Sequence, residues 1–139
     1  AIDYLADLGR EVTGDSSLAR RPALAAAYDA ILAYERKLLL QLLRGLAEQP
    51  AFQVRGVTEP ARISERMPTI SITHARLPSA DVARRLGELG VFAWHGNYYA
   101  LGVTESLGLE PQGMVRLGLV HYNTEEEVAR TVQALRSIG

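Results

Sequence analysis

The sequence predicts an α+β fold: a two-layer sandwich in which helices pack on one face of a small, mostly antiparallel sheet, preceded by a long helix. The 139 residues suffice for one domain with a single core, and a composition of 47% hydrophobic and 22% charged residues is typical of globular proteins. Short segments with a period of two alternate with turns and single helical segments. A long segment with helical periodicity precedes them. This order favours helices layered on one sheet.

The charge balance and residue content exclude several classes of function. Lys and Arg number 15 and Asp and Glu number 16, for a net charge of −1, so electrostatics gives no reason to expect nucleic acid or an anionic membrane as a partner. The absence of cysteine excludes disulfides, thiolate metal sites and a thiol nucleophile within this chain. No segment is apolar enough to span a bilayer, and no secretory signal is visible. We therefore expect a cytoplasmic protein.

The first residues look like the interior of a longer protein. The chain begins Ala1-Ile2-Asp3 without an initiator Met, and its pattern is already that of a helix. Residues 1–8 predict the tail of a helix that ends at Gly9, and the polar residues 9–17 predict a loop. We therefore expect residues 1–17 to be the tail of an upstream helix with a linker, and residues 18–139 to form the domain.

A long helix is predicted from Arg20 to Leu46, with Pro22 tolerated in its first turn. Its apolar positions form a stripe wider than a helix at the edge of one small domain needs. Two interpretations remain open. The helix belongs to the core of this domain, or it is shared between two domains or two subunits.

The remaining elements follow from periodicity and capping signals. Ser79 and Gly90 bracket one helix, and Thr124 with Glu127 forms a capping box at the start of the last. Residues 114–122 are apolar on both faces, which predicts a central strand. We predict strands at 52–56, 69–73, 91–94 and 114–122, helices at 80–89 and from 124 onward, and a short helix or irregular segment at 98–107.

Arg116 lies in the middle of the predicted central strand, among apolar neighbours. Its guanidinium cannot lose its charge, and burying that charge unpaired would cost several kcal/mol. It must therefore reach water or an anion, and its planar fork suits a carboxylate. The carboxylate could be an Asp or Glu of this domain or a group of a bound ligand.

A second cluster, Trp94-His95-Gly96-Asn97-Tyr98-Tyr99, follows a predicted strand. Loops of this kind line clefts, although aromatic clusters also simply pack. The three histidines lack metal-ligand spacing, and no phosphate-binding loop, nucleophile pattern or paired-carboxylate site is visible. From the residues alone, a stand-alone α+β module that binds a small molecule or regulates a partner remains an alternative to an enzyme domain.

Several stretches resemble one known family. The segment from Val115 to Val128, with Arg116 followed six residues later by Tyr122-Asn123-Thr124 and an acidic helix start, is similar to the closing strand and helix of class V aminotransferases and cysteine desulfurases. Those enzymes depend on pyridoxal phosphate (PLP). The resemblance extends to residues 2–9, 66–71 and 83–96, and so runs along the whole chain.

The resemblance implies that this chain is the C-terminal small domain of a fold-type I PLP enzyme whose large cofactor domain is absent here. Such enzymes are homodimers with the active site between the large domain, the small domain and the second subunit. It implies that Arg116 binds the α-carboxylate of an amino-acid substrate and that His95, Asn97, Tyr98 and Tyr99 belong to a loop that closes over it. The expected activity of the parent is that of a transferase or lyase. We expect no catalytic residue, no metal and no PLP on this chain alone.

Three departures from the family pattern affect the expected chemistry. Lys37, the only lysine, lies in the long helix with no sign of a cofactor site around it. The cysteine desulfurases that the chain resembles read Gly-His-His-Cys-Ala in the mobile loop, and this chain places Tyr99 at the cysteine position. Trp94 replaces an arginine just before the loop. Persulfide chemistry is therefore not expected of the parent enzyme.

Overall fold

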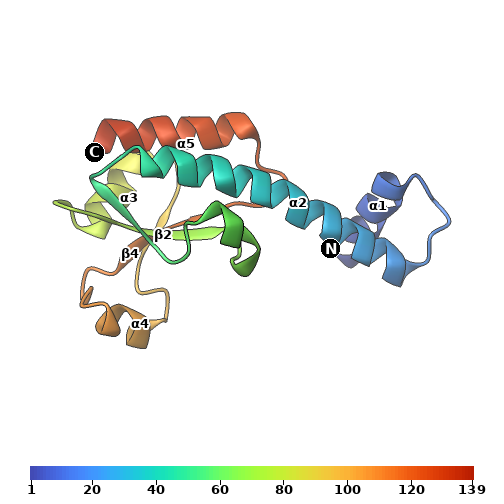
Figure 1. Cartoon of the computed structure of the whole chain (residues 1–139), viewed down its shortest axis with the longest axis horizontal. Coiled ribbons are helices and arrows are strands. Elements are labelled where there is room, and N and C mark those ends of the chain that lie inside the picture. Colours follow the sequence, from blue (N-terminus) through green and yellow to red (C-terminus); the bar gives the residue numbers. More distant parts are fainter.

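The computed structural model describes residues 1–139 and confirms the predicted α+β sandwich. A long helix crosses the molecule, and the sheet lies beneath its C-terminal half (Figure 1). The elements in chain order are α1 (Ile2–Thr13), α2 (Arg20–Ala47), β1 (Phe52–Arg55), the 3-10 helix η1 (Pro60–Glu65), β2 (Thr69–His74), α3 (Ser79–Glu88), β3 (Trp94–Gly96), α4 (Leu101–Ser106), β4 (Met114–Gly118) and α5 (Glu125–Ile138).

The sheet has the strand order β1-β2-β4-β3, and all three pairings are antiparallel. β4 therefore lies inside the sheet, as its apolar sequence predicts. Successive side chains point to opposite faces, so one face is apolar and buried. Its members are Phe52, Ile70, Ile72, Val115 and Leu117, and they pack with residues of α2, α3 and α5. No helix supplies a comparable set of buried side chains to the other face, which we call the open face.

The helical layer consists mainly of α2 and α5, which run side by side over the sheet (Figure 1). Leu38 and Leu42 of α2 and Leu135 of α5 are fully buried. Burying each such side chain contributes about 1.5–3 kcal/mol. Gly45 lets the two helices approach closely, because a Cβ built at this position would lie 2.4 Å from a methyl group of Val132.

The prediction that the first helix ends at Gly9 is wrong. α1 continues to Thr13 and ends at Gly14, whose φ of 70° is the left-handed conformation that glycine adopts easily. Gly9 instead allows α1 to touch α2, because a Cβ there would lie 1.8 Å from the carbonyl oxygen of Ala23. A glycine at a helix end and one at a helix contact look alike in a sequence, since both need the missing side chain.

The contact between α1 and α2 explains the wide apolar stripe of the long helix. Ala23 and Ala27 in the first half of α2 are buried in this part of the molecule, whereas Leu38 and Leu42 in the second half belong to the core of the sandwich. The α1–α2 hairpin projects beyond the sheet (Figure 1). The helix is therefore a core helix over its second half and a projecting arm over its first.

Three smaller expectations also need correction. Ser79 is not a cap: it lies within α3, where its hydroxyl donates to the carbonyl of Gln112. β3 begins at Trp94 and not at the predicted Val91, whose N–H donates to the Leu86 carbonyl of α3 at 2.8 Å rather than to the sheet. β4 ends at Gly118, and a turn follows it. The capping box of α5 is confirmed in both of its hydrogen bonds.

Candidate functional site

Arg116 projects from β4 on the open face, where its side chain is exposed to solvent. Ser71 of β2 and Trp94 of β3 lie directly opposite it on the two neighbouring strands. None of the ion pairs in the structure includes Arg116. The alternative of an internal Asp or Glu partner is therefore wrong, and the guanidinium is open to solvent.

Tyr98 is the one loop residue that contacts Arg116. The centre of its ring lies 5.0 Å from the guanidinium carbon, a cation–π distance. Its hydroxyl donates to the carbonyl of Met114, which ties the loop to β4. Burial raises the pKa of Tyr98, and the Arg116 charge opposes this only in part. The phenol is therefore neutral at physiological pH, and its ring lies beside the guanidinium, held by the hydrogen bond to Met114.

The loop itself has an unusual backbone. Tyr98 and Tyr99 both have positive φ, at 54° and 63°, and Gly96 has a φ of 109°. Non-glycine residues held in this region cost about 1–3 kcal/mol each and cluster at functional sites. Asn97 holds the turn: its side-chain oxygen accepts from the Tyr99 N–H at 3.2 Å, and its carbonyl accepts from the Ala100 N–H at 2.8 Å.

The backbone at Gly113 lies against the backbone at Gly96, where the loop begins. A Cβ built at Gly113 would lie 2.2 Å from the carbonyl carbon of Gly96, so only glycine fits. The two segments that flank α4 are thereby pressed together at the end of the sheet. This contact fixes where the loop leaves β3.

The structure brings together only some of the predicted site residues. Arg116 and Tyr98 are in contact, and Asn97 shapes the turn between them and Tyr99, whose side chain is fully exposed. His95 lies opposite Val115, a core residue, so the strand alternation places it on the other face from Arg116. His95 therefore does not join Arg116 in this conformation.

Sequence reasoning missed one residue of the open face, Arg55. The register places Arg55, Ser71 and Arg116 in one row across three strands. The Arg55 guanidinium donates to the Thr73 hydroxyl, at 3.2 Å from Nε and 3.0 Å from an Nη atom, and makes no ion pair. No pattern within β1 marks this residue, because the row exists only once three strands have paired.

Lys37 does not fit the role of a PLP-binding lysine. It is exposed on α2 and donates to the carboxylate of Glu125 at 2.5 Å. This hydrogen bond raises the pKa of Lys37, which keeps the amine protonated, whereas an amine that attacks an aldehyde must lose its proton. Lys37 is therefore a surface residue in an ion pair with Glu125.

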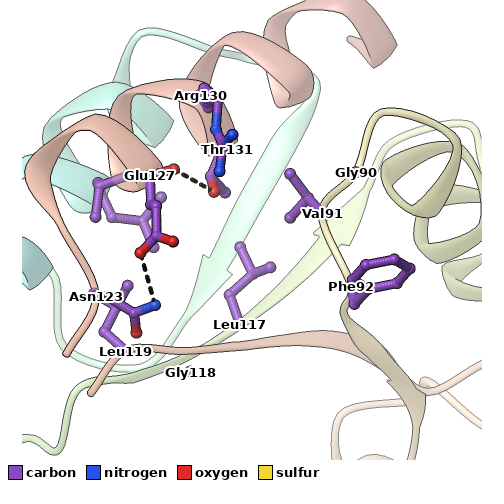
Figure 2. Close-up of a pocket in the computed structure, with 12 residues that line it drawn as sticks. Gly90, Val91, Phe92, Leu117, Gly118, Leu119, Asn123, Glu127, Arg130 and Thr131 are labelled. Atoms are coloured by element: carbon purple, nitrogen blue, oxygen red, sulfur yellow. Dashed lines mark hydrogen bonds between the residues drawn. The ribbon is translucent and has the colours of Figure 1, made fainter. Parts of the chain in front are cut away.

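A cavity of about 180 Å³ lies on the helix-covered side, between the start of α5 and the segment that follows α3 (Figure 2). Three of its polar residues are hydrogen-bonded to one another. The Asn123 amide donates to the Glu127 carboxylate at 3.1 Å, and the Thr131 hydroxyl donates to the Glu127 carbonyl at 2.9 Å. Hydrogen bonds from Thr124 and Asn123 lower the pKa of Glu127, as expected for a helix cap. The cavity thus follows from the helix start and lies on the far side of the sheet from Arg116.

No group of three or more His, Cys, Asp or Glu side chains is arranged to hold a metal ion. No helix of the structure has both the length and the apolar run that a membrane crossing requires.

Comparison with known proteins identifies the fold and the family. A sequence model of the family described as aminotransferase class-V matches residues 23–131, which is most of the chain. The chain belongs to the aminotransferase class-V family. The matched region contains Arg116, the loop at 95–100 and the whole sheet, so the resemblance seen in the sequence is confirmed.

Individual relatives of this family member are much longer. The chain is 35% identical over 115 residues to the aminotransferase-like protein FGM3 of Gibberella zeae, covering 80% of this chain and 28% of that protein. It is 34% identical over 106 residues to a probable cysteine desulfurase of Pseudomonas putida, covering 76% of this chain and 24% of that protein. The chain therefore spans less than a third of the length of these relatives.

Solved structures agree on the fold. The apo cysteine desulfurase of Thermococcus onnurineus superposes with a TM-score of 0.70 at 26% identity, over 84% of this chain and 30% of that one. The cysteine desulfurase CsdA of Escherichia coli gives a TM-score of 0.64 at 20% identity, over 89% of this chain and 32% of that one. The α+β sandwich is thus shared with cysteine desulfurases.

Proposed function

We propose that this chain is the substrate-binding small domain of a PLP-dependent transferase or lyase that acts on an amino acid. In this proposal Arg116 binds the α-carboxylate of the substrate, and the loop of Asn97, Tyr98 and Tyr99, which follows His95 of β3, closes over it. A separate large domain supplies the cofactor, and a second subunit completes the active site of a cytoplasmic homodimer. The observation that carries the proposal is the exposed, unpaired guanidinium on a strand of otherwise apolar sequence.

The geometry suits carboxylate binding. The guanidinium can donate two parallel hydrogen bonds to one carboxylate, and each such charge-assisted bond is stronger than a neutral one. Tyr98 limits the directions in which the Arg116 side chain can turn, because its ring lies against one side of the guanidinium. Holding the carboxylate in a fixed position orients the reacting carbon of the substrate, which is positional catalysis.

The domain contributes binding rather than a nucleophile. Tyr99 stands at the loop position where the cysteine desulfurases that this loop resembles carry cysteine, and its side chain is fully exposed. A phenol cannot attack sulfur as a thiolate does, and the chain has no cysteine to replace it. The proposed parent activity therefore involves no persulfide on this domain.

The test is the Arg116→Lys variant of the full-length protein that contains this chain. Lysine keeps the charge but loses the fork, so kcat/KM for the best amino acid of a panel should fall by about 2–4 kcal/mol, or roughly 30- to 1000-fold. The free energy of unfolding should fall by about 1 kcal/mol or less, as for an exposed site.

Arg44→Lys is the matched control, because Arg44 is also exposed and unpaired but lies on α2, in the helical layer. It should leave kcat/KM unchanged. A normal kcat/KM for Arg116→Lys, with a large loss of stability, would show that Arg116 serves folding and would end the carboxylate assignment.

A further inference from the structure

The strands that form the open face supply two guanidinium groups and no carboxylate. Arg55 and Arg116 are its cationic strand residues, and the four strands contain no Asp or Glu at all, although the chain as a whole has 16 acidic residues. Some arginines outside the sheet pair with nearby acids, as Arg62 does with Glu65 at 2.7 Å and Arg84 with Glu88 at 2.8 Å. On the strands no acidic residue is available, so Arg55 and Arg116 leave this face positive.

Arg55 and Arg116 are placed to act on one ligand. They are separated by the single residue Ser71 of the intervening strand, and two inter-strand steps put their Cα atoms about 10 Å apart. Both side chains leave the same face of the sheet. Thr73 accepts from two nitrogens of Arg55, and Tyr98 flanks Arg116, so each guanidinium is held by a neighbour that does not neutralise it.

Two like charges in one row repel each other, and this repulsion is relieved when an anion lies between them. A ligand with one carboxylate satisfies only one of the two guanidinium groups. A ligand with two anionic groups a few bonds apart satisfies both, and the Ser71 hydroxyl between them can donate to either.

We propose that the substrate is an amino acid whose side chain carries a second anionic group, such as a carboxylate, and that Arg55 binds this group while Arg116 binds the α-carboxylate. This inference rests on the proposed function of Arg116 and adds the substrate class to it. Arg55 is then a specificity-determining residue.

The test uses Trp94 as a reporter, because it is the only tryptophan of the chain and lies directly opposite Arg116 on the open face. Its fluorescence is titrated with acetate and with succinate at constant ionic strength. Succinate should bind about ten times more tightly than acetate, since one additional charge-assisted interaction is worth about a factor of ten or more.

Two variants separate the two claims. Arg55→Gln should lower the succinate-to-acetate affinity ratio from about ten to about one, and Arg116→Gln should weaken both ligands at least fivefold. Arg44→Gln, on the helical layer, should change neither. Circular dichroism of each variant checks that the fold is retained.

The outcomes are distinct. A ratio near one in the unmodified chain, or a ratio that Arg55→Gln leaves at ten, overturns the assignment of Arg55 and leaves the role of Arg116 standing. Unchanged acetate binding in Arg116→Gln overturns the proposed function itself. In the full-length protein, the same Arg55→Gln change should lower kcat/KM for glutamate or aspartate relative to alanine by about tenfold. An unchanged glutamate-to-alanine ratio would contradict the inference there.

Discussion

The two faces of the four-stranded sheet are built from the same strands and differ in almost every other respect. On the helix-covered face Ile72, Val115 and Leu117 are buried beneath α2, α3 and α5. On the open face Arg55 and Arg116 have no ionic partner, and two consecutive tyrosines in the loop beside Arg116 have left-handed backbone. The side chains of the first face pack against the helices of the same domain. The second face has arginines without an ionic partner and a strained backbone in the adjacent loop. Features of the second kind gather where proteins bind ligands.

The largest expected difference between the faces is in the cost of removing a large side chain. Leu135→Ala on the helix-covered side should lower the free energy of unfolding by about 2–5 kcal/mol, because Leu135 is fully buried and would leave a cavity. Trp94→Ala on the open face should cost about 1 kcal/mol or less, since the Trp94 side chain is 66% exposed. Urea unfolding followed by circular dichroism measures both. Equal losses would mean that the open face contributes to the core and is not reserved for a ligand.

Glycine substitutions sharpen the same comparison. Gly45→Ala should destabilise the chain by about 1–3 kcal/mol, because its Cβ would lie 2.4 Å from a Val132 methyl group and would force the two helices apart. Gly118→Ala is the control, since a Cβ there meets nothing within 4 Å. It should change the free energy of unfolding by about 0.5 kcal/mol or less.

The pair Gly45 and Val132 can be tested further by a double-mutant cycle. If the loss in Gly45→Ala comes from the clash, Val132→Ala should recover a large part of it in the double variant. Additive losses would show that the two residues act independently, and the close approach of α2 and α5 would then have to be explained by other contacts.

The helix-covered face was the more predictable of the two. Periodicity and local capping chemistry predict the strand at 69–73, the long helix at 20–46 and the capping box of the last helix, and the structure extends the strand and the long helix by one residue each. These signals are local, because periodicity and capping depend only on residues a few positions apart in the sequence. Local signals predict a helix end at Gly9, whereas the glycine is needed for the contact with Ala23, a residue of another helix.

The open face shows the limit of local signals. Arg116 stands out in the sequence because its strand is apolar, and the structure confirms that the strand is internal. Arg55 does not stand out, since its partners in the row come from strands that are distant in sequence. His95 and Tyr98 were expected in one loop, yet the alternation along β3 sends His95 to the far face. Which residues share a site depends on strand order and register, and neither is encoded within a single strand.

The smallest expected effect concerns the pH dependence of stability, which should arise on the helix-covered side. His74 ends β2 beside Phe52, with ring centres 4.9 Å apart, and its Nδ1 accepts from the backbone N–H groups of Arg76 and Leu77, each at 3.0 Å. Burial, with the nearby Arg76 and Arg85 charges, lowers the pKa of His74 below its ordinary value of 6.5. The unfolded chain therefore takes up a proton more readily than the folded one. The contribution of neutral His74 to the free energy of unfolding is therefore fully present above about pH 6.5 and declines as the pH falls toward the pKa of the folded state.

The His74→Asn variant tests this assignment. Asparagine can accept the same two N–H groups without titrating, so the variant should flatten the decline in urea unfolding measured between pH 7 and pH 5. An equal slope in the variant would assign the pH dependence to other groups.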